Sequence, residues 1–534
     1  MSKKVFMLLY DIDVNKGGIT SVMLSRSREL SRRFGYDVDL ISLDYKNNYD
    51  EIQEKLIQDG RLFPKVNILN VHTYYRDKFS AGKIKREQLK HYEDASKLHE
   101  EGLFVQEDTL KNYARYFGNG EYVKYKKWSQ DGRLSHIDHF SENRNRLYRE
   151  EFHKKGYIYR KIWYDLICNE PKQELHFTED GFCYLNKWYN PNNGKLQKIF
   201  LFDRFTNQAR EFKSNKEFHV YWLNELCREQ KEKPFLICDG VGSASKVSSM
   251  DPDAAYRIYA IHTNHFDAPY QYGSPIKEDH VTLLDNLEKE EALVVLTESQ
   301  KKDIVKQYGD YKNVYVVPNF ITPIKDYKLE RDPKLVTMIA RYHPEKGIDE
   351  AIIAFGKVVK KLPDAKLEIY GHGEDEDRLR SMIKEKKLGK NVFLKGYTTK
   401  VGEVLGRSSM TLLTSQFEGL NVVSLESMFC KVPVVSYDVN YGMRDIIQNG
   451  KTGYLVSYGD RDALAERIVE MLTNPKKITK MGIEAHEFVI RNFSKVHVCR
   501  KWESLFNELE NKNPLVGGRE LVHVKSKFLQ ENKE

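Results

Sequence analysis

The N-terminal segment constrains the fold most strongly, because it joins two apolar runs through a glycine turn and an amphipathic stretch. Residues 5–10 and 37–43 have the composition of buried strands, whereas residues 20–34 have the apolar spacing of a helix. The turn before this helix contains Gly17-Gly18. This order of strand, helix and strand predicts a βαβ unit of a parallel sheet. Residues 66–71 are expected to form a third short strand.

The same alternation of strands and helices returns in the second half of the chain. Further strands of the first domain are expected at residues 234–239, 257–262, 292–296 and 314–317. After a linker that runs to Pro333, a second set of strands is expected at 335–340, 366–370, 392–394, 410–414 and 432–437, with helices at 347–362, 375–386, 420–429 and 477–511. The predicted fold class is α/β, with two doubly wound domains and a cleft at the carboxyl ends of their sheets.

Between these two halves the pattern changes to short alternating runs separated by turns. Asp131-Gly132 and Asn193-Gly194 are dipeptides typical of tight hairpins. We expect an antiparallel β domain inserted into the first α/β domain; a β extension without its own core is the alternative. The predicted domains are an N-terminal Rossmann-like acceptor domain (1–76 and 215–322), the inserted β domain (77–214), a C-terminal Rossmann-like nucleotide-sugar domain with a closing helix (323–512) and a tail (513–534).

Composition and termini limit the classes of function. The chain has 86 basic and 78 acidic residues and a net charge of +8, which favours anionic partners. No apolar run approaches the length of a membrane span. The apolar run at the N-terminus is short, ends at Asp11 and lacks a cleavage site. The six cysteines are not spaced as a metal clip and suit a reducing compartment. We expect a cytoplasmic protein that can make peripheral contact with the inner membrane face.

Two charged pairs follow apolar runs of the second predicted domain. Arg341 and Lys346 lie five residues apart, and Glu418 and Glu426 lie eight residues apart. Arg offers a planar fork and Lys a mobile point charge, which together suit a diphosphate. An ionised carboxylate only accepts hydrogen bonds, so the two Glu residues suit the hydroxyls of a sugar. These pairs predict a site for a negatively charged donor that carries hydroxyls, although the cations alone could form a solvated loop.

The loops around these pairs supply further candidates. The first amides of the helix after Glu418, near Leu420 and Asn421, could hold a phosphate oxygen. Glu426 lies on that helix among apolar residues, where a carboxylate is costly without a partner such as a ribose diol. Other strand-end loops could contact a nucleobase: Gly371, His372 and Tyr397.

The first predicted domain offers weaker signals. The glycines at Gly17-Gly18 would let backbone amides approach an anion, but many such turns need glycine for geometry alone. Asp11 and Asp13 could hold a divalent cation on a diphosphate; no third carboxylate accompanies them, so we expect no metal site. His262 ends a strand and could hydrogen-bond a sugar or an acceptor, or could satisfy local backbone groups instead.

Taken together, these residues resemble a known family. The glycine pair, the strand-end His, Arg-x-x-x-x-Lys and Glu-x7-Glu occur in the order typical of retaining GT-B glycosyltransferases of family four. The resemblance implies a UDP-sugar donor, no metal and no other cofactor. It implies that Glu426 binds the ribose, that Glu418 holds hydroxyls of the donor sugar, and that His262 lines the reaction centre. The donor diphosphate would be held by Gly17, Gly18, Arg341, Lys346 and the amides near Leu420.

A narrower group shares more of the chain. Wall teichoic acid α-glycosyltransferases have a similar insert, a similar segment at 44–50 and a similar start to Lys4-Val-Phe-Met-Leu-Leu-Tyr-Asp-Ile-Asp-Val-Asn-Lys-Gly-Gly-Ile-Thr20. They transfer glucose or N-acetylglucosamine to poly(glycerol-phosphate) or poly(ribitol-phosphate). The resemblance implies a polyanionic teichoic acid acceptor, an α-linkage and a homotrimer formed through residues 77–214. A related group glycosylates Ser-rich adhesins, but its glycine loop differs from this one.

The sequence therefore predicts a UDP-sugar-dependent retaining hexosyltransferase, and no nucleic-acid partner. It does not choose between glucose and N-acetylglucosamine, or between ribitol and glycerol. A catalytically silent scaffold and a pyridoxal-phosphate phosphorylase of the same fold are alternatives from other classes. The predicted catalytic residues are His262, Arg341, Lys346 and Glu418. The predicted substrate-binding residues are Gly17, Gly18, Arg341, Lys346, Gly371, His372, Tyr397, Glu418, Gly419, Leu420, Asn421 and Glu426.

Overall fold

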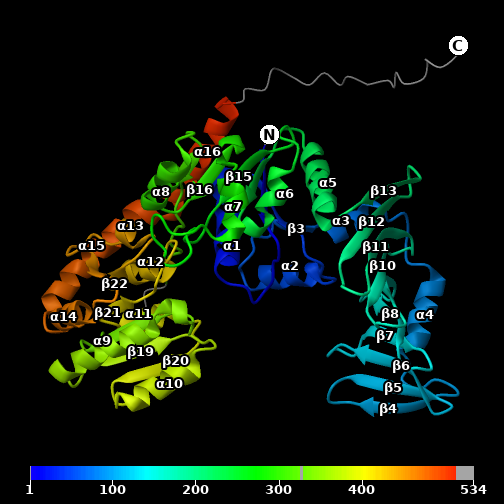
Figure 1. The fold of residues 1–534 in the computed structure, drawn as a ribbon, viewed down its shortest axis with the longest axis horizontal. Helices are drawn as coiled ribbons and strands as arrows, with labels where there is room; N and C mark the ends of the chain where they lie inside the picture. Colours follow the sequence, from blue (N-terminus) through cyan, green and yellow to red (C-terminus); the bar gives the residue numbers. More distant parts are fainter. Residues whose placement is uncertain (1, 325–328, 513–534) are drawn as a thin grey trace. The chain divides into compact units, whose positions relative to one another are not determined.

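The predicted βαβ unit opens the first parallel sheet. The computed structural model describes residues 2–324 and 329–512, whose fold is drawn in Figure 1. Strands β1 (Lys4–Leu9) and β2 (Asp37–Ser42) pair in parallel, and helix α1 (Ile19–Phe34) connects them. All residues of β1 after Lys4 are buried, as expected for a central strand of a sheet covered on both faces. The tail predicted at residues 513–534 lies outside the described residues.

The first sheet has the strand order of a doubly wound domain, β17-β16-β15-β14-β1-β2-β3. Its order reverses between β1 and β14, and ligands of such sheets bind outside the carboxyl ends of the strands at that point. The other strands are β3 (Asn67–Asn70), β14 (Phe235–Cys238), β15 (Tyr256–Ala260), β16 (Ala292–Val295) and β17 (Val314–Val316), and the helices are α2 (Tyr49–Gln58), α3 (Val71–Lys78), α5 (Asn215–Arg228), α6 (Ala244–Ser248), α7 (Glu278–Leu284) and α8 (Glu298–Tyr308).

An antiparallel sheet is inserted between β3 and β14, as predicted. Its strands β4 to β13 are neighbours in sequence order: β4 (Phe104–Asp108), β5 (Tyr113–Gly118), β6 (Glu121–Trp128), β7 (Leu134–Phe140), β8 (Arg146–Phe152), β9 (Ile158–Tyr164), β10 (Pro171–Phe177), β11 (Cys183–Tyr189), β12 (Leu196–Asp203) and β13 (Gln208–Phe212). Helix α4 (Arg86–Ser96), which the alternating pattern did not predict, lies beside this sheet in Figure 1. Tyr92 and Ala95 of α4 pack against a small core of Leu134, Ile137 and Phe152.

The second parallel sheet has the order β20-β19-β18-β21-β22-β23, which is the Rossmann order with its switch point between β18 and β21. Its strands are β18 (Leu335–Ile339), β19 (Lys366–Tyr370), β20 (Val392–Gly396), β21 (Met410–Leu413), β22 (Val434–Asp438) and β23 (Gly453–Ser457), and its helices are α9 (Ile348–Lys361), α10 (Glu376–Glu385), α11 (Val401–Arg407), α12 (Val422–Phe429), α13 (Met443–Ile446) and α14 (Arg461–Leu472). The apolar faces of α9, α12 and α14 enter one core with the strands.

The closing helix predicted at residues 477–511 is two helices, so that prediction was wrong in one respect. Helix α15 (Pro475–Phe493) ends at Phe493. The next residue, Ser494, has an extended backbone with ψ 151°, and α16 (Lys495–Lys512) begins directly after it. The carbonyl of Phe493 accepts a hydrogen bond of 2.8 Å from the N–H of Ile321 instead of a helical donor. Apolar residues continue on both sides of the break, which is why the sequence pattern did not locate it.

The chain divides into two compact units, Met1–Ile261 with Ile276–Glu290 and His262–Pro275 with Glu291–Glu534. The inserted sheet belongs to the first unit, and the segment that begins at His262 belongs to the second. The sequence predicts the boundary between the two α/β domains at residue 323, which is later in the chain than the unit boundaries at His262 and Glu291. The predicted domain limits stay a prediction. No helix within residues 2–324 and 329–512 combines the length and the apolar character needed to cross a membrane.

Candidate functional site

Lys346 and Glu418, which belong to separate sequence motifs, form an ion pair. Lys346 follows β18 in a short 3₁₀ turn, Pro344–Lys346, and Glu418 follows β21, so both lie at the switch point of the second sheet. The Nζ of Lys346 donates to Oε1 of Glu418 at 3.0 Å, and only 17% and 11% of the two side chains are exposed. Each side chain retains hydrogen-bonding capacity for a ligand, because Lys has three donors and a carboxylate has two oxygens.

Arg341 is paired with a carboxylate that the sequence analysis did not single out. Its guanidinium donates to Glu345 at 2.7 Å, and 71% of the Arg341 side chain is exposed. The other predicted cation, Lys346, lies 3.9 Å from the same carboxylate oxygen. Glu345 therefore links the two predicted phosphate-binding cations. Its position directly before Lys346 was the available signal, but a charged residue in a loop is usually solvated.

Gly419 brings the segment of His262 against the loop of Glu418. A Cβ placed on Gly419 would lie 2.2 Å from the carbonyl oxygen of His262, which is too close for any side chain. Only glycine allows two backbones to approach in this way. His262 follows β15 and belongs to the same compact unit as Lys346 and Glu418. The sequence predicts His262 in the first domain, opposite these residues; in the structure it belongs to their compact unit.

Helix α12 carries Glu426 and starts close to Glu418. Asn421 caps the helix by accepting a hydrogen bond of 2.7 Å from the N–H of Ser424, and Leu420 precedes it as a buried residue. The predicted helix start at 420 lies two residues before the observed first residue, Val422. Burial raises the pKa of Glu426 from its ordinary value of 4.5 to about 7. Among residues 2–324 and 329–512, Glu426 has no ion-pair partner, and a buried carboxylate of this kind suits a hydroxyl-bearing ligand.

The predicted nucleobase residues also lie together. The rings of His372 and Tyr397 meet edge to face with centroids 5.4 Å apart. They are carried by the ends of neighbouring strands, since β19 ends at Tyr370 and β20 ends at Gly396. The N–H of Gly371 donates to the carbonyl of Gly396 at 2.9 Å and fixes these two loops. Tyr397 is 71% exposed, so its ring face is open to a planar ligand.

The glycine pair of the first unit lies at the start of α1. Gly18 is the N-cap residue of α1, with φ 55° and ψ −123°, a conformation that residues with a Cβ rarely adopt. Among the described residues, no atom lies within 4 Å of a Cβ placed on Gly17 or Gly18. Both positions are exposed. The geometry therefore needs glycine at Gly18, and it leaves space for a ligand to reach the backbone.

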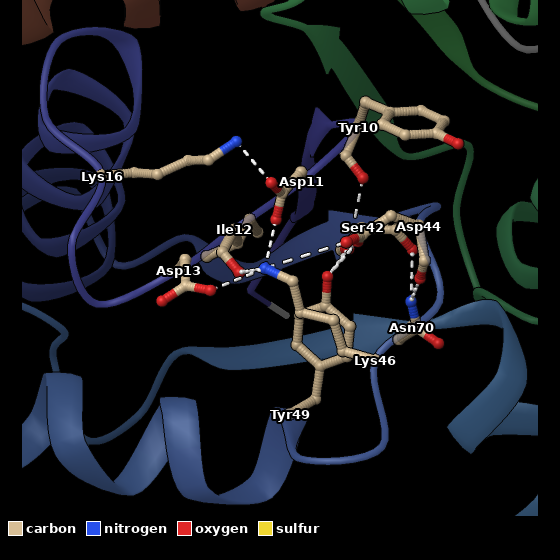
Figure 2. Close-up of polar contacts among 10 residues, drawn as sticks. All are labelled: Tyr10, Asp11, Ile12, Asp13, Lys16, Ser42, Asp44, Lys46, Tyr49 and Asn70. Carbon is tan, nitrogen blue, oxygen red and sulfur yellow. Dashed lines mark hydrogen bonds and ion pairs between the residues drawn. The ribbon is translucent and has the colours of Figure 1, made fainter.

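Lys46 organises the loop that leads to this glycine pair (Figure 2). Its Nζ donates to Asp13 at 2.8 Å, to the carbonyl of Ile12 at 3.0 Å and also to Asp11. Burial raises the pKa of Asp11, but hydrogen bonds from Lys16 and Lys46 outweigh this effect and lower it. The hydrogen bond from Lys46 lowers the pKa of Asp13. The two carboxylates considered as metal ligands are thus ionised and engaged by lysines.

Further contacts hold both sides of this loop. Asn70 donates to the carbonyls of Asp44 at 2.7 Å and Ser42 at 3.1 Å, which fixes the chain just before Lys46 (Figure 2). Arg61 donates to the carbonyl of Lys16 at 2.7 Å. Sequence analysis missed Lys46, Arg61 and Asn70, because each lies in a different segment and none belongs to a motif. Only the parallel pairing of β1, β2 and β3 brings them together.

Comparisons with known proteins agree with this architecture. A family model described as "Glycosyl transferases group 1" matches residues 321–488. The poly(ribitol-phosphate) alpha-N-acetylglucosaminyltransferase of Staphylococcus aureus (strain COL) is 33% identical over 511 residues, which is 95% of this chain and 100% of that protein. The poly(glycerol-phosphate) alpha-glucosyltransferase of Bacillus subtilis (strain 168) is 24% identical and covers 93% of this chain, with 73% of that protein matched.

A solved structure extends the likeness to three dimensions. The crystal structure of a mutant of S. aureus TarM in complex with fondaparinux, alpha-GlcNAc-glycerol and UDP has a TM-score of 0.80 and 32% identity. It covers 95% of this chain and 100% of that chain. The fold class predicted from the sequence, GT-B with an inserted antiparallel sheet, is confirmed. Identity of 33% along nearly the whole chain, together with this shared fold, shows that the chain belongs to the wall teichoic acid α-glycosyltransferases.

Proposed function

We propose that this hexosyltransferase moves N-acetylglucosamine from UDP-N-acetylglucosamine to hydroxyls of poly(ribitol-phosphate), forming an α-linkage. The ion pair between Lys346 and Glu418 carries the proposal, because it places a cation for phosphate beside an acceptor for sugar hydroxyls. The higher identity to the poly(ribitol-phosphate) enzyme than to the poly(glycerol-phosphate) enzyme favours this donor and acceptor. Glucose and poly(glycerol-phosphate) are the competing pair.

The mechanism follows from the charge that develops on the leaving group. As the bond between the anomeric carbon and the phosphate oxygen breaks, its electron pair stays on the β-phosphate. Lys346 and Arg341 stabilise that charge, and such preorganised electrostatics is usually the largest catalytic contribution. The acceptor hydroxyl bonds to the anomeric carbon from the same face, and its proton passes to the departing phosphate oxygen. The α configuration of the donor is thereby retained.

Within this mechanism Glu418 holds and orients the donor sugar. One of its oxygens accepts from Lys346, and the other can accept from a sugar hydroxyl. His372 and Tyr397 would contact the uracil ring, and Glu426 the ribose diol. We propose that Gly17-Gly18 contributes backbone amides to the diphosphate. We propose that no metal takes part, since Lys346 and Arg341 supply the positive charge.

We expect purified protein to release UDP when it receives UDP-N-acetylglucosamine and poly(ribitol-phosphate). The assay crosses that donor and UDP-glucose with poly(ribitol-phosphate), poly(glycerol-phosphate) and a Ser-rich peptide, each with and without a chelator. Release should be highest with the proposed pair and unchanged by the chelator. NMR of the new anomeric proton should show the α product. An inverted product, or turnover of the peptide alone, would contradict the proposal.

The inserted sheet supports self-association, which we propose to be a homotrimer. It exposes large apolar side chains on β4 and in its turns, including Phe104 (74%), Leu110 (95%) and Ile167 (92%). Phe104 and Leu110 lie at the edge strand β4, and Ile167 lies in the turn between β9 and β10. Exposed apolar side chains on a sheet with an open edge strand are typical of an interface. The net charge of +8 also suits a polyanionic polymer or the anionic inner membrane face, and we propose a cytoplasmic enzyme with peripheral contact there. The basic residues at 154–155 and 160–161 lie beside carboxylates in the structure, so they do not carry this proposal.

Light scattering of the native protein is expected to give about three times the chain mass of 62.7 kDa. Leu110→Asp with Ile167→Asp should lower that mass to one chain, because buried charges without partners oppose association. Ile483→Asp, on the exposed face of α15 and outside the insert, is the control and should leave the mass unchanged. A monomeric native protein would rule out the trimer without affecting the proposed reaction.

A further inference from the structure

A cavity of about 1080 Å³ lies in the second compact unit, beside the loop of Glu418. Its walls come from helix α8, the chain after β22 and the loop at residues 268–272. Among the described residues, its lining includes neither Arg341 nor Lys346, so it is distinct from the predicted diphosphate site. The proposed donor therefore does not account for this cavity.

Two lysines give the cavity its positive charge. Lys302 and Lys306 lie four residues apart on α8, so they share one face of the helix. Within residues 2–324 and 329–512, neither has a carboxylate partner. The Nζ of Lys306 lies 3.9 Å from the ring centroid of Tyr272, a contact that leaves its hydrogen-bond donors available. Both charges are therefore available to an anionic ligand.

The carboxylates of the cavity are already engaged. Asp438 accepts two hydrogen bonds from Arg444, at 2.7 and 2.8 Å. Asp303 accepts a hydrogen bond of 2.8 Å from the hydroxyl of Tyr441. Arg444 thus neutralises Asp438, whereas the hydroxyl of Tyr441 leaves the charge of Asp303 in place. The charged groups of the lining are Lys302, Lys306 and Arg444 against Asp303 and Asp438, so a ligand meets a net charge of +1. The remaining polar lining groups are hydroxyls and amides, among them Tyr270, Gln416 and Tyr458.

The cavity is tied to the loop of Glu418 by buried contacts. The side chain of Asn264, which is fully buried, donates to the carbonyls of Tyr270 at 2.9 Å and Asn440 at 3.2 Å. The carbonyl of Asn440 also accepts from the N–H of Glu418 at 3.1 Å. The ring of Tyr270 packs on Phe417 with centroids 4.3 Å apart. A ligand in the cavity is thus held next to the residue proposed to orient the donor sugar.

We propose that this cavity binds a phosphodiester of the acceptor polymer, next to the polyol that receives the sugar. The inference rests on the proposed function and adds the residues that recognise the acceptor. Lys302 and Lys306 contact the phosphate, while Tyr270 and Gln416 hydrogen-bond polyol hydroxyls. In a polyol-phosphate chain each polyol is flanked by phosphates, so anchoring one phosphate positions the neighbouring hydroxyls. Phospholipid headgroups also contain a phosphodiester. The contacts between the cavity wall and the loop of Glu418 favour the acceptor polymer as the ligand, because they place the cavity beside the proposed donor sugar.

The test compares Lys302→Gln/Lys306→Gln with the native protein in steady-state assays. The KM for poly(ribitol-phosphate) should rise about tenfold, because charge-assisted contacts to the phosphate are lost. The kcat of this variant should equal that of the native protein, and so should its affinity for UDP measured by calorimetry. Lys301→Gln/Lys312→Gln removes the same charge from positions outside the cavity and should leave the KM unchanged. An unchanged KM in the cavity variant would overturn the proposal.

Two further arms separate this inference from the proposed function. A short glycerol-phosphate oligomer is titrated into each variant, and binding should weaken only in the cavity variant. If the native protein shows no turnover but this pattern holds, the proposed function fails and the subsite stands. Binding to phosphatidylglycerol vesicles is the second arm. Loss of vesicle binding in the cavity variant, with unchanged oligomer affinity, would assign the cavity to a membrane headgroup and overturn the acceptor subsite.

Discussion

Lys346→Ala is expected to lower kcat by about 10²–10³-fold while the protein remains folded. The alanine variant loses the ammonium group that is proposed to meet the charge growing on the β-phosphate. Its partner Glu418 would lose a 3.0 Å ion pair, so circular dichroism and thermal unfolding should accompany the kinetics. Lys346→Arg should recover only part of the rate, because a planar guanidinium does not reproduce the position of an ammonium.

Lys357→Ala is the matched control for that experiment. Lys357 lies on the neighbouring helix α9 and forms an exposed ion pair of 2.6 Å with Asp462. Removing such a surface pair changes stability by at most about 1 kcal/mol, and it should leave kcat unchanged. If Lys346→Ala turned over at the native rate, the phosphate role of Lys346 would be wrong, and the Lys346–Glu418 pair would be structural.

UDP should bind about tenfold more tightly at pH 8 than at pH 6, because Glu426 has a pKa of about 7 in the free protein. A ribose diol donates two hydrogen bonds, and the ionised carboxylate is the form that accepts both. At pH 6 most molecules carry the protonated form, and binding must first remove that proton. Calorimetry in buffers of different ionisation enthalpy should show release of a proton at pH 6.

Glu426→Gln should remove this pH dependence and give weak binding across the range. Glu385→Gln, on the exposed face of α10, should bind UDP as the native protein does. As the pH rises, the contribution of Glu426 to folding stability falls, whereas the affinity for UDP increases. Because the folded pKa of Glu426 lies above its ordinary value of 4.5, its favourable contribution is complete below pH 4.5 and is lost as the pH rises through 7. Native affinity for UDP in Glu426→Gln would remove this residue from the site.

The α/β architecture could be predicted because its signals are local. Each apolar run that ended in a loop became a strand within one or two residues, as β1 and β18 show. Features decided by tertiary contacts were not predictable. The break at Ser494 depends on Ile321, which is distant in sequence, and α4 lies in a segment whose neighbours alternate like strands.

The candidate site divides in the same way. Lys346 and Glu418 could be predicted because parallel strands present their following loops at one edge of a sheet. Lys46 and Arg61 could not, because they act on the backbone of a loop far from them in sequence. The cavity lined by Lys302 could not be predicted from the sequence either, since two lysines on a helix usually face solvent. The segment of His262 joins the second unit through Gly419, and no periodicity signals such a contact.

The ion pair between Lys346 and Glu418 has a consequence for selectivity in a crowded cell. In the ligand-free protein, each group neutralises the other, so the site presents little net field to passing anions. Inorganic phosphate would have to compete with Glu418 for the ammonium, and a neutral sugar would have to compete with Lys346 for the carboxylate. A nucleotide sugar offers a phosphate and a hydroxyl at once and can satisfy both groups in a single exchange. The pair therefore favours binding of the intact nucleotide sugar over binding of phosphate or sugar alone.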